Sequence, residues 1–207
     1  MNMLKKRILF FFFILSLLSC TSYQQTTYYL LTAIDPTRSI LEIKNNKSLM
    51  RILVKNIKFP DYLDRPQMVL RDDDYKLELS EYHRWAEPLK DDFTRVFIEN
   101  LNARIMPNLA SNYAGLEGVK PSHELSVEVL RMDVNTKHQV ILKTKWSLSS
   151  EKNNDLVITH KGEFTLPVDN KSHESAVKAQ SKAIALFADQ IATTIQTLQQ
   201  HSKKQSK

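Results

Sequence analysis

The sequence contains little of what most catalytic, metal-binding and nucleotide-binding motifs require. Its 207 residues include one cysteine and three glycines. It has neither a Gly-x-Ser-x-Gly elbow nor a Gly-x-x-x-x-Gly-Lys phosphate loop. The six histidines, at positions 83, 123, 138, 160, 173 and 201, lack the His-x-His and His-Glu-x-x-His spacings of zinc sites. These absences predict a protein that is not an enzyme and holds no cofactor or metal. An enzyme that uses carboxylates brought together only by the fold remains an alternative, because a sequence does not reveal such pairs.

The charge of the chain does not indicate a nucleic-acid partner. The net charge is +6, and three of the 29 cationic residues lie in the first seven positions. A nucleic-acid-binding domain needs a dense basic stripe on its folded part, and none is visible. The acidic triplet Asp72-Asp73-Asp74 lacks the alternating oxygen ligands and the glycine of a calcium loop, so we interpret it as a solvated turn.

The first 19 residues have the layout of a secretory signal peptide. The cationic start Lys5-Lys6-Arg7 precedes an apolar run, Ile8–Leu18, which is shorter than the roughly 20 residues that span a bilayer. Residues 1–19 are therefore predicted to be cleaved. The remaining 188 residues carry a net charge of +3, and they suffice for one domain with its own core.

The only cysteine, Cys20, directly follows this leader. Leu17-Leu18-Ser19-Cys20 resembles the bacterial lipobox, in which a diacylglyceryl group is attached to the thiol and the cysteine becomes the new N-terminus. A lone cysteine has no disulfide partner in its own chain, whereas several acyl chains on it would anchor the protein stably. Thr21, rather than aspartate, follows, and by the enterobacterial sorting rule of this class it directs the protein to the outer membrane. The inner membrane is the lesser alternative.

Residues 20–27 are predicted to form a lipidated tether. The seven residues after Cys20 reach at most about 25 Å at 3.3–3.6 Å each. The folded body would therefore stay close to its membrane, and any reach across the periplasm would come from a partner.

The first half of the folded part is predicted to hold four strands and a helix. The strands are expected at Tyr28–Leu31, Leu49–Ile57, Gln67–Arg71 and Tyr75–Tyr82, the second of them central and the last half-buried. His83–Leu89 then opens a helix with Pro88 at an early position. Its apolar stripe comprises Leu89, Phe93, Val96, Phe97, Leu101 and Ile105, and Pro107 ends it.

The second half, after a loop at residues 108–121, is predicted to hold three strands and a longer helix. Within His123–Val134 the apolar positions change phase after Val129, which indicates a bulge. Apolar and polar residues alternate regularly from Val140 to Leu148 and from Leu156 to Leu166, with a turn at Asn153-Asn154-Asp155 between them. This pattern predicts an antiparallel meander with one solvent-exposed face. A helix from about Glu174 to Gln200 should lie across the sheet. Its apolar stripe comprises Val177, Ile184, Phe187, Ile191, Ile195 and Leu198.

These elements predict an α+β fold. It would have a mixed or antiparallel sheet, two main helices packed on one side, and two roughly similar βββα halves. Residues 28–200 would form this single domain, and residues 201–207 a polar basic tail.

Three segments carry a resemblance to a known family. They are Tyr28-Tyr29-Leu30-Leu31 soon after Cys20, Tyr62-Leu63-Asp64-Arg65-Pro66-Gln67-Met68-Val69, and Arg84-Trp85-Ala86-Glu87-Pro88-Leu89. Together they resemble the ABC-type transport auxiliary lipoproteins, and in particular the paraquat-inducible (PqiC) type.

The resemblance implies a non-enzymatic lipoprotein on the inner leaflet of the outer membrane of a Gram-negative bacterium, facing the periplasm. Its partner would be a periplasm-spanning protein of the MCE type, in a system that moves lipids or other hydrophobic molecules, and a ring-forming homo-oligomer is compatible with this. The motif residues would either support the fold or contact the partner; they are Tyr62, Asp64, Arg65, Pro66, Gln67, Arg84, Trp85 and Glu87. If these residues support the fold, Trp85 would be a core aromatic, and Arg84 and Glu87 would form an ion pair at the start of the helix.

A second hypothesis is an envelope lipoprotein that acts on its own. A lipid carrier would need a lipid-sized apolar cavity under the C-terminal helix. A hydrolase would need a convergent polar pocket with shifted pKa values.

Overall fold

A computed structural model defines the fold over residues 24–34, 51–73, 75–105, 110–112, 120–150 and 156–205. The predictions for the signal peptide, for Cys20, for Pro107 and for the turn at residues 153–155 lie outside these ranges.

Three long antiparallel strands form the regular part of the sheet. β6 (His123–Asn135), β7 (Gln139–Ser150) and β8 (Leu156–Pro167) pair in sequence order, as the predicted meander requires. The predicted bulge lies between Val129 and Arg131, where the register of β6 on β7 shifts. Alternate residues of β7 are buried, among them Trp146, so one face of the meander packs against the core.

The first-half strands are shorter and attach to the free edge of β6. They are β1 (Thr27–Tyr29), β2 (Ile52–Val54), β3 (Gln67–Arg71) and β4 (Leu77–Trp85). In the described ranges the order is β1-β4-β3-β6-β2-β5, where β5 (Ala110–Ser111) is a two-residue strand. β3 and β4 pair antiparallel, whereas β1–β4, β3–β6, β2–β6 and β2–β5 pair parallel. The sheet is therefore mixed, and the expected central strand lies between two neighbours although it is only three residues long.

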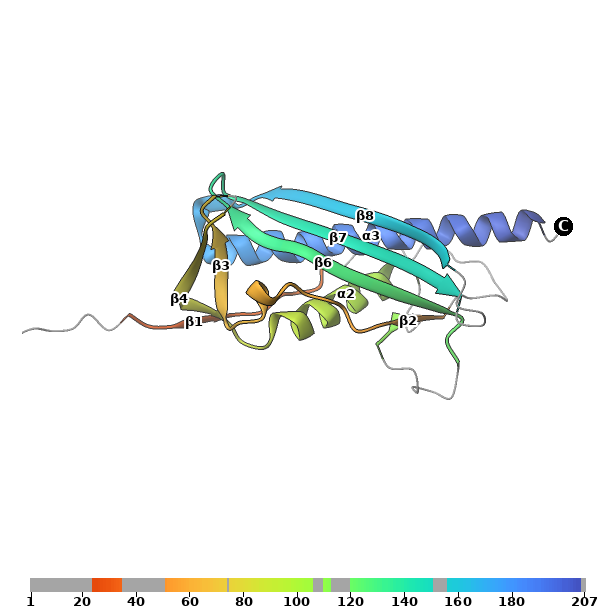
Figure 1. The fold of residues 1–207 in the computed structure, drawn as a ribbon, viewed down its shortest axis with the longest axis horizontal. Helices are drawn as coiled ribbons and strands as arrows, with labels where there is room; N and C mark the ends of the chain where they lie inside the picture. The colour runs from red at the N-terminus through yellow and green to blue at the C-terminus, as the bar shows by residue number, and fades with distance from the viewer. Residues whose placement is uncertain are drawn as a thin grey trace, which may run out of the picture.

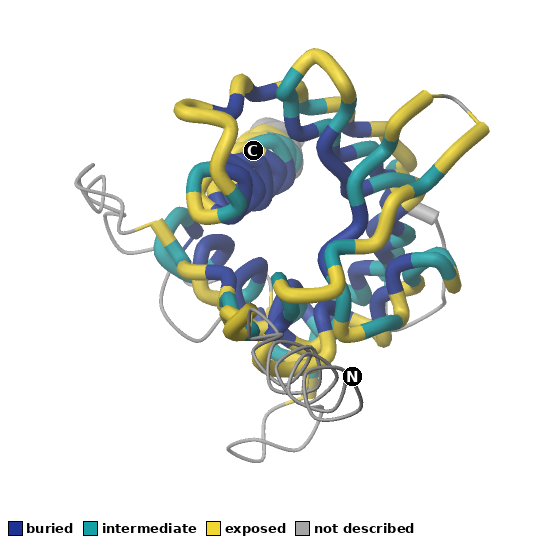
Figure 2. Tube along the Cα trace, turned by 90° about the vertical axis from the view of Figure 1, so that its left-hand side faces the viewer, coloured by how far each residue is buried: buried dark blue, intermediate teal, exposed yellow. Residues whose placement is uncertain are grey.

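Both main helices cover the same side of the sheet (Figure 1). α2 (Leu89–Ile105) and α3 (His173–Gln205) bury the predicted apolar stripes, and the rings of Phe97 and Phe187 stack with centroids 5.1 Å apart between them. Figure 2 shows the buried parts of the sheet and of the helices facing one another. Two short 3-10 helices, η1 (Asp61–Leu63) and η3 (Asp169–Lys171), lie in connections. The fold is thus α+β, as predicted.

In the described ranges the first half holds four strands before its helix, as its segments predict, so the summary of both halves as βββα holds only in outline. Other boundaries differ from the predictions. The segment His83–Trp85 does not open a helix but ends β4, because it pairs in register with β1. Tyr75 lies before β4 and is 98% exposed. The C-terminal helix continues to Gln205, into the predicted tail.

In the described part of the chain, neither helix is long and apolar enough to cross a membrane.

Candidate functional site

The Tyr62 motif covers a buried carboxylate on the outer face of the sheet, which is the face turned away from α2 and α3. Asp133 is 0% exposed and accepts hydrogen bonds from the Tyr62 hydroxyl at 3.2 Å, Arg71 Nε at 3.1 Å and Arg131 Nε at 2.8 Å. The Arg71 guanidinium also lies 5.7 Å from the centre of the Tyr62 ring. Burial and the Asp133 charge raise the pKa of Tyr62, so the hydroxyl remains a donor. Tyr62 therefore fastens the β2–β3 connection to β6.

Sequence reasoning did not identify Asp133 as the partner of this motif. The available signal was a carboxylate between two buried apolar residues of a strand, Met132 and Val134. A buried carboxylate needs donors, and the sequence does not show which cations the fold brings to it.

The rest of the Tyr62 motif forms a turn that contacts the segment Arg84-Trp85-Ala86-Glu87-Pro88-Leu89, the third of the segments that carry the family resemblance. The Pro66 carbonyl accepts the Trp85 N–H at 2.7 Å, and Gln67 pairs with Arg84. Arg65 packs with its Nε buried and without a hydrogen-bond partner among the described residues, while Asp64 is exposed. The two motifs thus lie together because β3 and β4 are neighbours, and Trp85 is a core aromatic at 5% exposure.

The expected ion pair between Arg84 and Glu87 does not form. Arg84 Nη2 lies 3.8 Å from Glu81 Oε2, and Glu87 Oε1 lies 3.5 Å from Arg95 Nη2. The prediction was wrong because Arg84 does not open the helix: it lies in β4 and pairs with Tyr28 of β1, and α2 begins only at Leu89.

Polar side chains of both helices hold the first described segment of the chain. Asp92 Oδ2 accepts the Leu31 N–H at 2.7 Å, Ser181 Oγ the Thr32 N–H at 3.1 Å and Asn100 Oδ1 the Ile34 N–H at 3.3 Å. Asp92, Asn100 and Ser181 are all buried, so these bonds are shielded from water. The segment that follows the predicted tether is therefore fixed to the core.

Asp92 contributes to this attachment in a second way. It also forms an ion pair with Arg95, whose Nη2 donates to the Leu31 carbonyl at 3.3 Å. Burial raises the pKa of Asp92, and the Leu31 N–H and the Arg95 charge act in the opposite direction.

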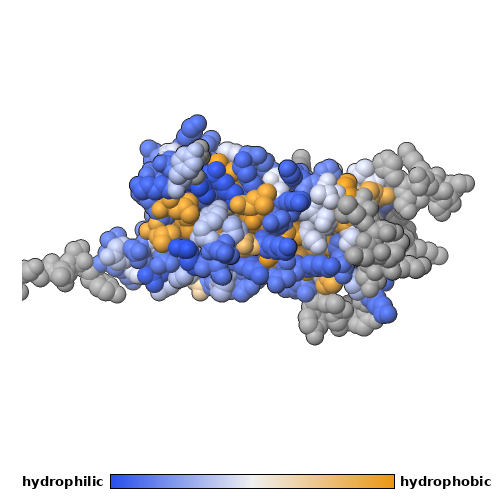
Figure 3. All heavy atoms as spheres, viewed as in Figure 1, coloured by the Kyte–Doolittle hydropathy of each residue, from blue (hydrophilic) through white to orange (hydrophobic). Residues whose placement is uncertain are grey.

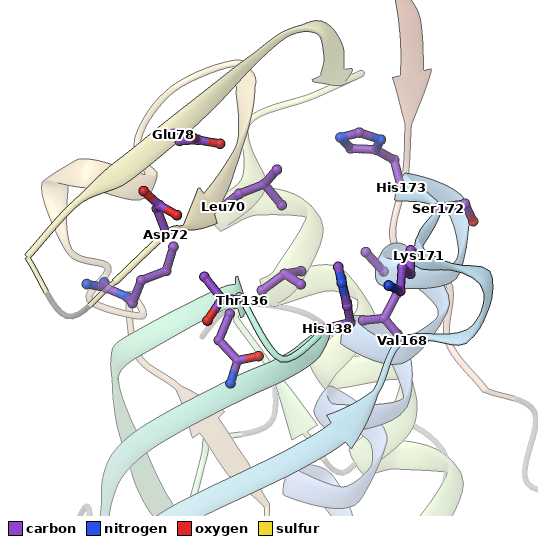
Figure 4. A pocket seen from close by; sticks show the side chains of 13 residues that line it. Leu70, Asp72, Glu78, Thr136, His138, Val168, Lys171, Ser172 and His173 are labelled. Atoms are coloured by element: carbon purple, nitrogen blue, oxygen red, sulfur yellow. The ribbon is translucent and has the colours of Figure 1, made fainter.

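A pocket of about 220 Å³ lies at the end of the sheet where three connections meet (Figure 4). The connections are the β3–β4 hairpin, the β6–β7 turn and the η3 segment before α3. Its apolar lining comprises Leu70, Val134, Val168 and Ala176. Asp72 and Glu78 lie on one side of the opening, and His138, Lys171 and His173 on the other (Figure 4). Its lining thus combines an apolar part with charges of both signs.

The backbone at this pocket is strained. Within the described ranges, the non-glycine residues with positive φ are His138 at 54°, Asn170 at 54° and Lys171 at 51°. The left-handed conformation costs roughly 1–2 kcal/mol for most L-residues and less for asparagine. His138 and Lys171 both line the pocket. Each therefore contributes to the pocket lining from a backbone position where glycine would be unstrained.

Two histidines stack beside the pocket. The rings of His83 and His173 lie 3.6 Å apart, the Tyr29 hydroxyl is 2.9 Å from His83 Nδ1, and Ser80 Oγ is 3.1 Å from His173 Nε2. Burial, and then the neighbouring His83, lower the pKa of His173. A serine hydrolase would also need a carboxylate to orient the histidine and donors for an oxyanion. The contacts of His173 in the described chain are instead to Ser80, His83 and Tyr29, and they fix the start of α3 on β4.

A shallow groove of about 460 Å³ crosses the outer face of β6 and β7. It is lined by the side chains of Lys55, Lys58 and Lys145 together with polar groups from Asn56, Ser126, Glu128, Ser147 and Thr159. Register places Lys58, Glu128, Lys145 and Lys161 in one row across four segments. Lys145 and Lys161 are thus like charges opposite one another, an arrangement that destabilises a sheet. Within the described residues Lys55 forms an ion pair with Glu124, whereas Lys58, Lys145 and Lys161 form none. The row thus holds three cations and one carboxylate, Glu128, and has a net positive charge.

No group of three or more histidine, cysteine, aspartate or glutamate side chains could hold a metal ion in the part of the chain that the structure describes.

The fold and its sites define a class of protein: a mixed sheet backed by two helices, in which buried polar side chains attach the N-terminal segment and the β2–β3 connection to the core. The sequence model of the ABC-type transport auxiliary lipoprotein component matches residues 29–192. The chain therefore belongs to the ABC-type transport auxiliary lipoprotein family. No curated protein matches the sequence.

Solved structures support the same fold. A crystal structure of an uncharacterized protein superposes with a TM-score of 0.67 at 19% identity, covering 83% of this chain and 99% of the other. A Xanthomonas campestris protein of the family DUF330 superposes with a TM-score of 0.65 at 15% identity, covering 86% of this chain and 99% of the other. At these identities the likeness concerns the fold alone.

Proposed function

We propose that this lipoprotein is anchored to the outer membrane through acylated Cys20, faces the periplasm, and docks a periplasm-spanning MCE-type partner for the transport of lipids or other hydrophobic molecules. The observation that carries the proposal is the family match over residues 29–192, since it describes an auxiliary component of a transporter. The protein would act by binding and not by catalysis, and it could do so as a homo-oligomer.

The attachment of the N-terminal segment supports this role. Leu31, Thr32 and Ile34 are fixed by buried side chains of α2 and α3. A force between the membrane anchor and a docked partner would therefore be transmitted through these hydrogen bonds to the hydrophobic core.

The groove on the outer face offers a surface for the partner. In the part of the chain that the structure describes, no helix lies over it, and Lys58 and Lys145, which form no ion pair there, suit an acidic segment of another protein. The pocket at the end of the sheet, at about 220 Å³, is smaller than the 300–1,000 Å³ typical of small-molecule sites, and a lipid carrier would need more.

Purification of the protein from its native envelope after crosslinking tests the proposal. The wild type is expected to capture an MCE-type protein, and Cys20→Ala is expected to capture less of it because the anchor is lost. Lys58→Glu with Lys145→Glu is expected to weaken capture, whereas Lys137→Glu with Lys182→Glu, at two exposed lysines outside the groove, serves as the control with the same charge change. Recovery of the wild type alone with a bound lipid would contradict docking and favour an independent carrier.

A further inference from the structure

Exposed apolar side chains gather at one end of the molecule. In the described chain, Tyr28 is 62% exposed, Leu30 49%, Leu79 38% and Tyr82 42%, and all four lie on or directly after the edge strand β1 and its neighbour β4. We call these four residues the tyrosine patch. Tyr75, in the hairpin that leads into β4, adds a fully exposed ring at the same end.

Contacts on the other side of β4 show that the tyrosine patch faces outward. Ser80 and His83 both contact His173 on the helix side of the sheet. They share this side because the register of β3 on β4 shifts between Gln67, which pairs with Arg84, and Met68, which pairs with Ser80. Leu79 pairs with Val69, two residues before Arg71, whose guanidinium binds Asp133 on the outer face, so Leu79 lies on that outer face. Tyr82 directly precedes His83 and points to the side opposite to it. Tyr28 pairs in register with Arg84, two residues after Tyr82, and therefore shares that face. An apolar area is visible over β3 and β4 from this side (Figure 3).

The tyrosine patch lies close to the predicted anchor in sequence. Tyr28 follows Cys20 by eight residues, which span at most about 29 Å when fully extended. α3 runs from the end where β1 and β4 lie to the opposite end of the molecule (Figure 1), and its 33 residues correspond to about 50 Å. A lipid anchor on Cys20 would therefore hold the end that carries the tyrosine patch near the lipid headgroups, and the C-terminal end of α3 lies far from that end.

We infer that the tyrosine patch lies in the headgroup region of the membrane to which Cys20 is attached. This inference rests on the proposed lipid anchor and adds an orientation to it. Tyrosine is favoured at membrane interfaces because its ring is apolar and its hydroxyl is polar. Contact with the membrane would add a second attachment to the acyl chains and would direct the groove and the far end of α3 toward the periplasm.

Labelled cysteines test the inference in the acylated, full-length protein. Cys20 is the only native cysteine and its thiol would be acylated, so a cysteine introduced by Tyr82→Cys is the single site for a polarity-sensitive dye. Leu186→Cys on α3 is the matched control, since Leu186 is 39% exposed and Tyr82 is 42%. Both proteins are added to vesicles of phosphatidylethanolamine and phosphatidylglycerol, some with brominated chains that quench the dye. Flotation and the mass of the N-terminal peptide verify acylation.

The expected result is a blue shift and at least threefold stronger quenching of the dye at position 82 than at position 186. Equal quenching of the two dyes in protein that floats would overturn the inference while leaving the lipid anchor intact. A blue shift that appears without vesicles and grows with protein concentration would overturn it in favour of a second copy on the tyrosine patch. Failure to float would contradict the anchor, and with it both the proposed location and this inference.

Discussion

The strands of the two halves differ in length and in what holds them. β6, β7 and β8 run for 13, 12 and 12 residues, whereas β1, β2 and β3 run for 3, 3 and 5 residues and β4 for 9. Long ladders and a continuous apolar face hold the second half. The first half depends in addition on single buried carboxylates, Asp133 under the Tyr62 motif and Asp92 under the N-terminal segment. The second half is therefore the scaffold, and the first half carries the family motifs and joins the anchor to it.

Removal of Asp133 should break this arrangement most severely. In Asp133→Ala, Arg71 and Arg131 would face a site with no anion, and breaking a buried ion pair in this way costs about 3–5 kcal/mol of the free energy of unfolding. Urea denaturation measures the change. Asp64→Ala removes an exposed carboxylate of the same motif and should change stability by less than about 0.5 kcal/mol. A loss below 1 kcal/mol in Asp133→Ala would show that the motif is not fastened through Asp133.

A substitution in the scaffold sharpens the comparison. The Cβ of Gly162→Ala would lie 2.7 Å from Thr144 Oγ1 and 2.9 Å from the Phe164 ring, so overpacking should cost about 1–3 kcal/mol. Thr144→Ala should relieve part of this cost, and the two changes together should destabilise by less than the sum of the single effects. Additive effects in thermal or urea unfolding would contradict close packing at this position.

Asp92→Ala tests the attachment of the N-terminal segment. It leaves the buried Leu31 N–H without an acceptor, which should cost about 1–3 kcal/mol. Hydrogen exchange of the Leu31 and Thr32 amides should accelerate more than that of the β7 amides, because the loss is local. Asp91→Ala, at the exposed neighbouring position, is the control and should leave both rates unchanged.

The smallest effect is expected from pH. Burial lowers the pKa of His173 and of His123, so the unfolded chain binds these protons more readily than the folded one. Stability contributed by the neutral rings is present above a pH of about 6.5, the ordinary histidine value, and is lost as the pH falls below it. His173→Asn should flatten part of this slope in unfolding experiments between pH 7 and pH 5. If the free energy of unfolding depends on pH as steeply in His173→Asn as in the wild type, other groups account for the pH dependence.

The regular half could be predicted from sequence because its apolar residues alternate. The β6 strand, its bulge after Val129 and the apolar stripe of α3 all match the pattern. The first half was harder because its strands are short and are placed by contacts distant in sequence. His83–Trp85 forms strand and not helix because β1 pairs with it across more than 50 residues.

The sites could be predicted only in part for the same reason, since their contacts join residues that are distant in sequence. The motif segments identified the family and included Tyr62, but the partner of Tyr62 lies 71 residues away. Lys58, Lys145 and Lys161 are unremarkable in the sequence and become a row only through strand register.

Site-specific photocrosslinking in the native envelope tests the docking of a partner most directly. A photoreactive residue at position 145 in the groove is compared with one at position 182, where Lys182 is exposed on α3. The proposed function predicts a crosslink to a periplasm-spanning MCE-type protein from position 145 and not from position 182. Crosslinks from position 145 only to lipid, or to no protein at all, would contradict docking through the outer face of the sheet.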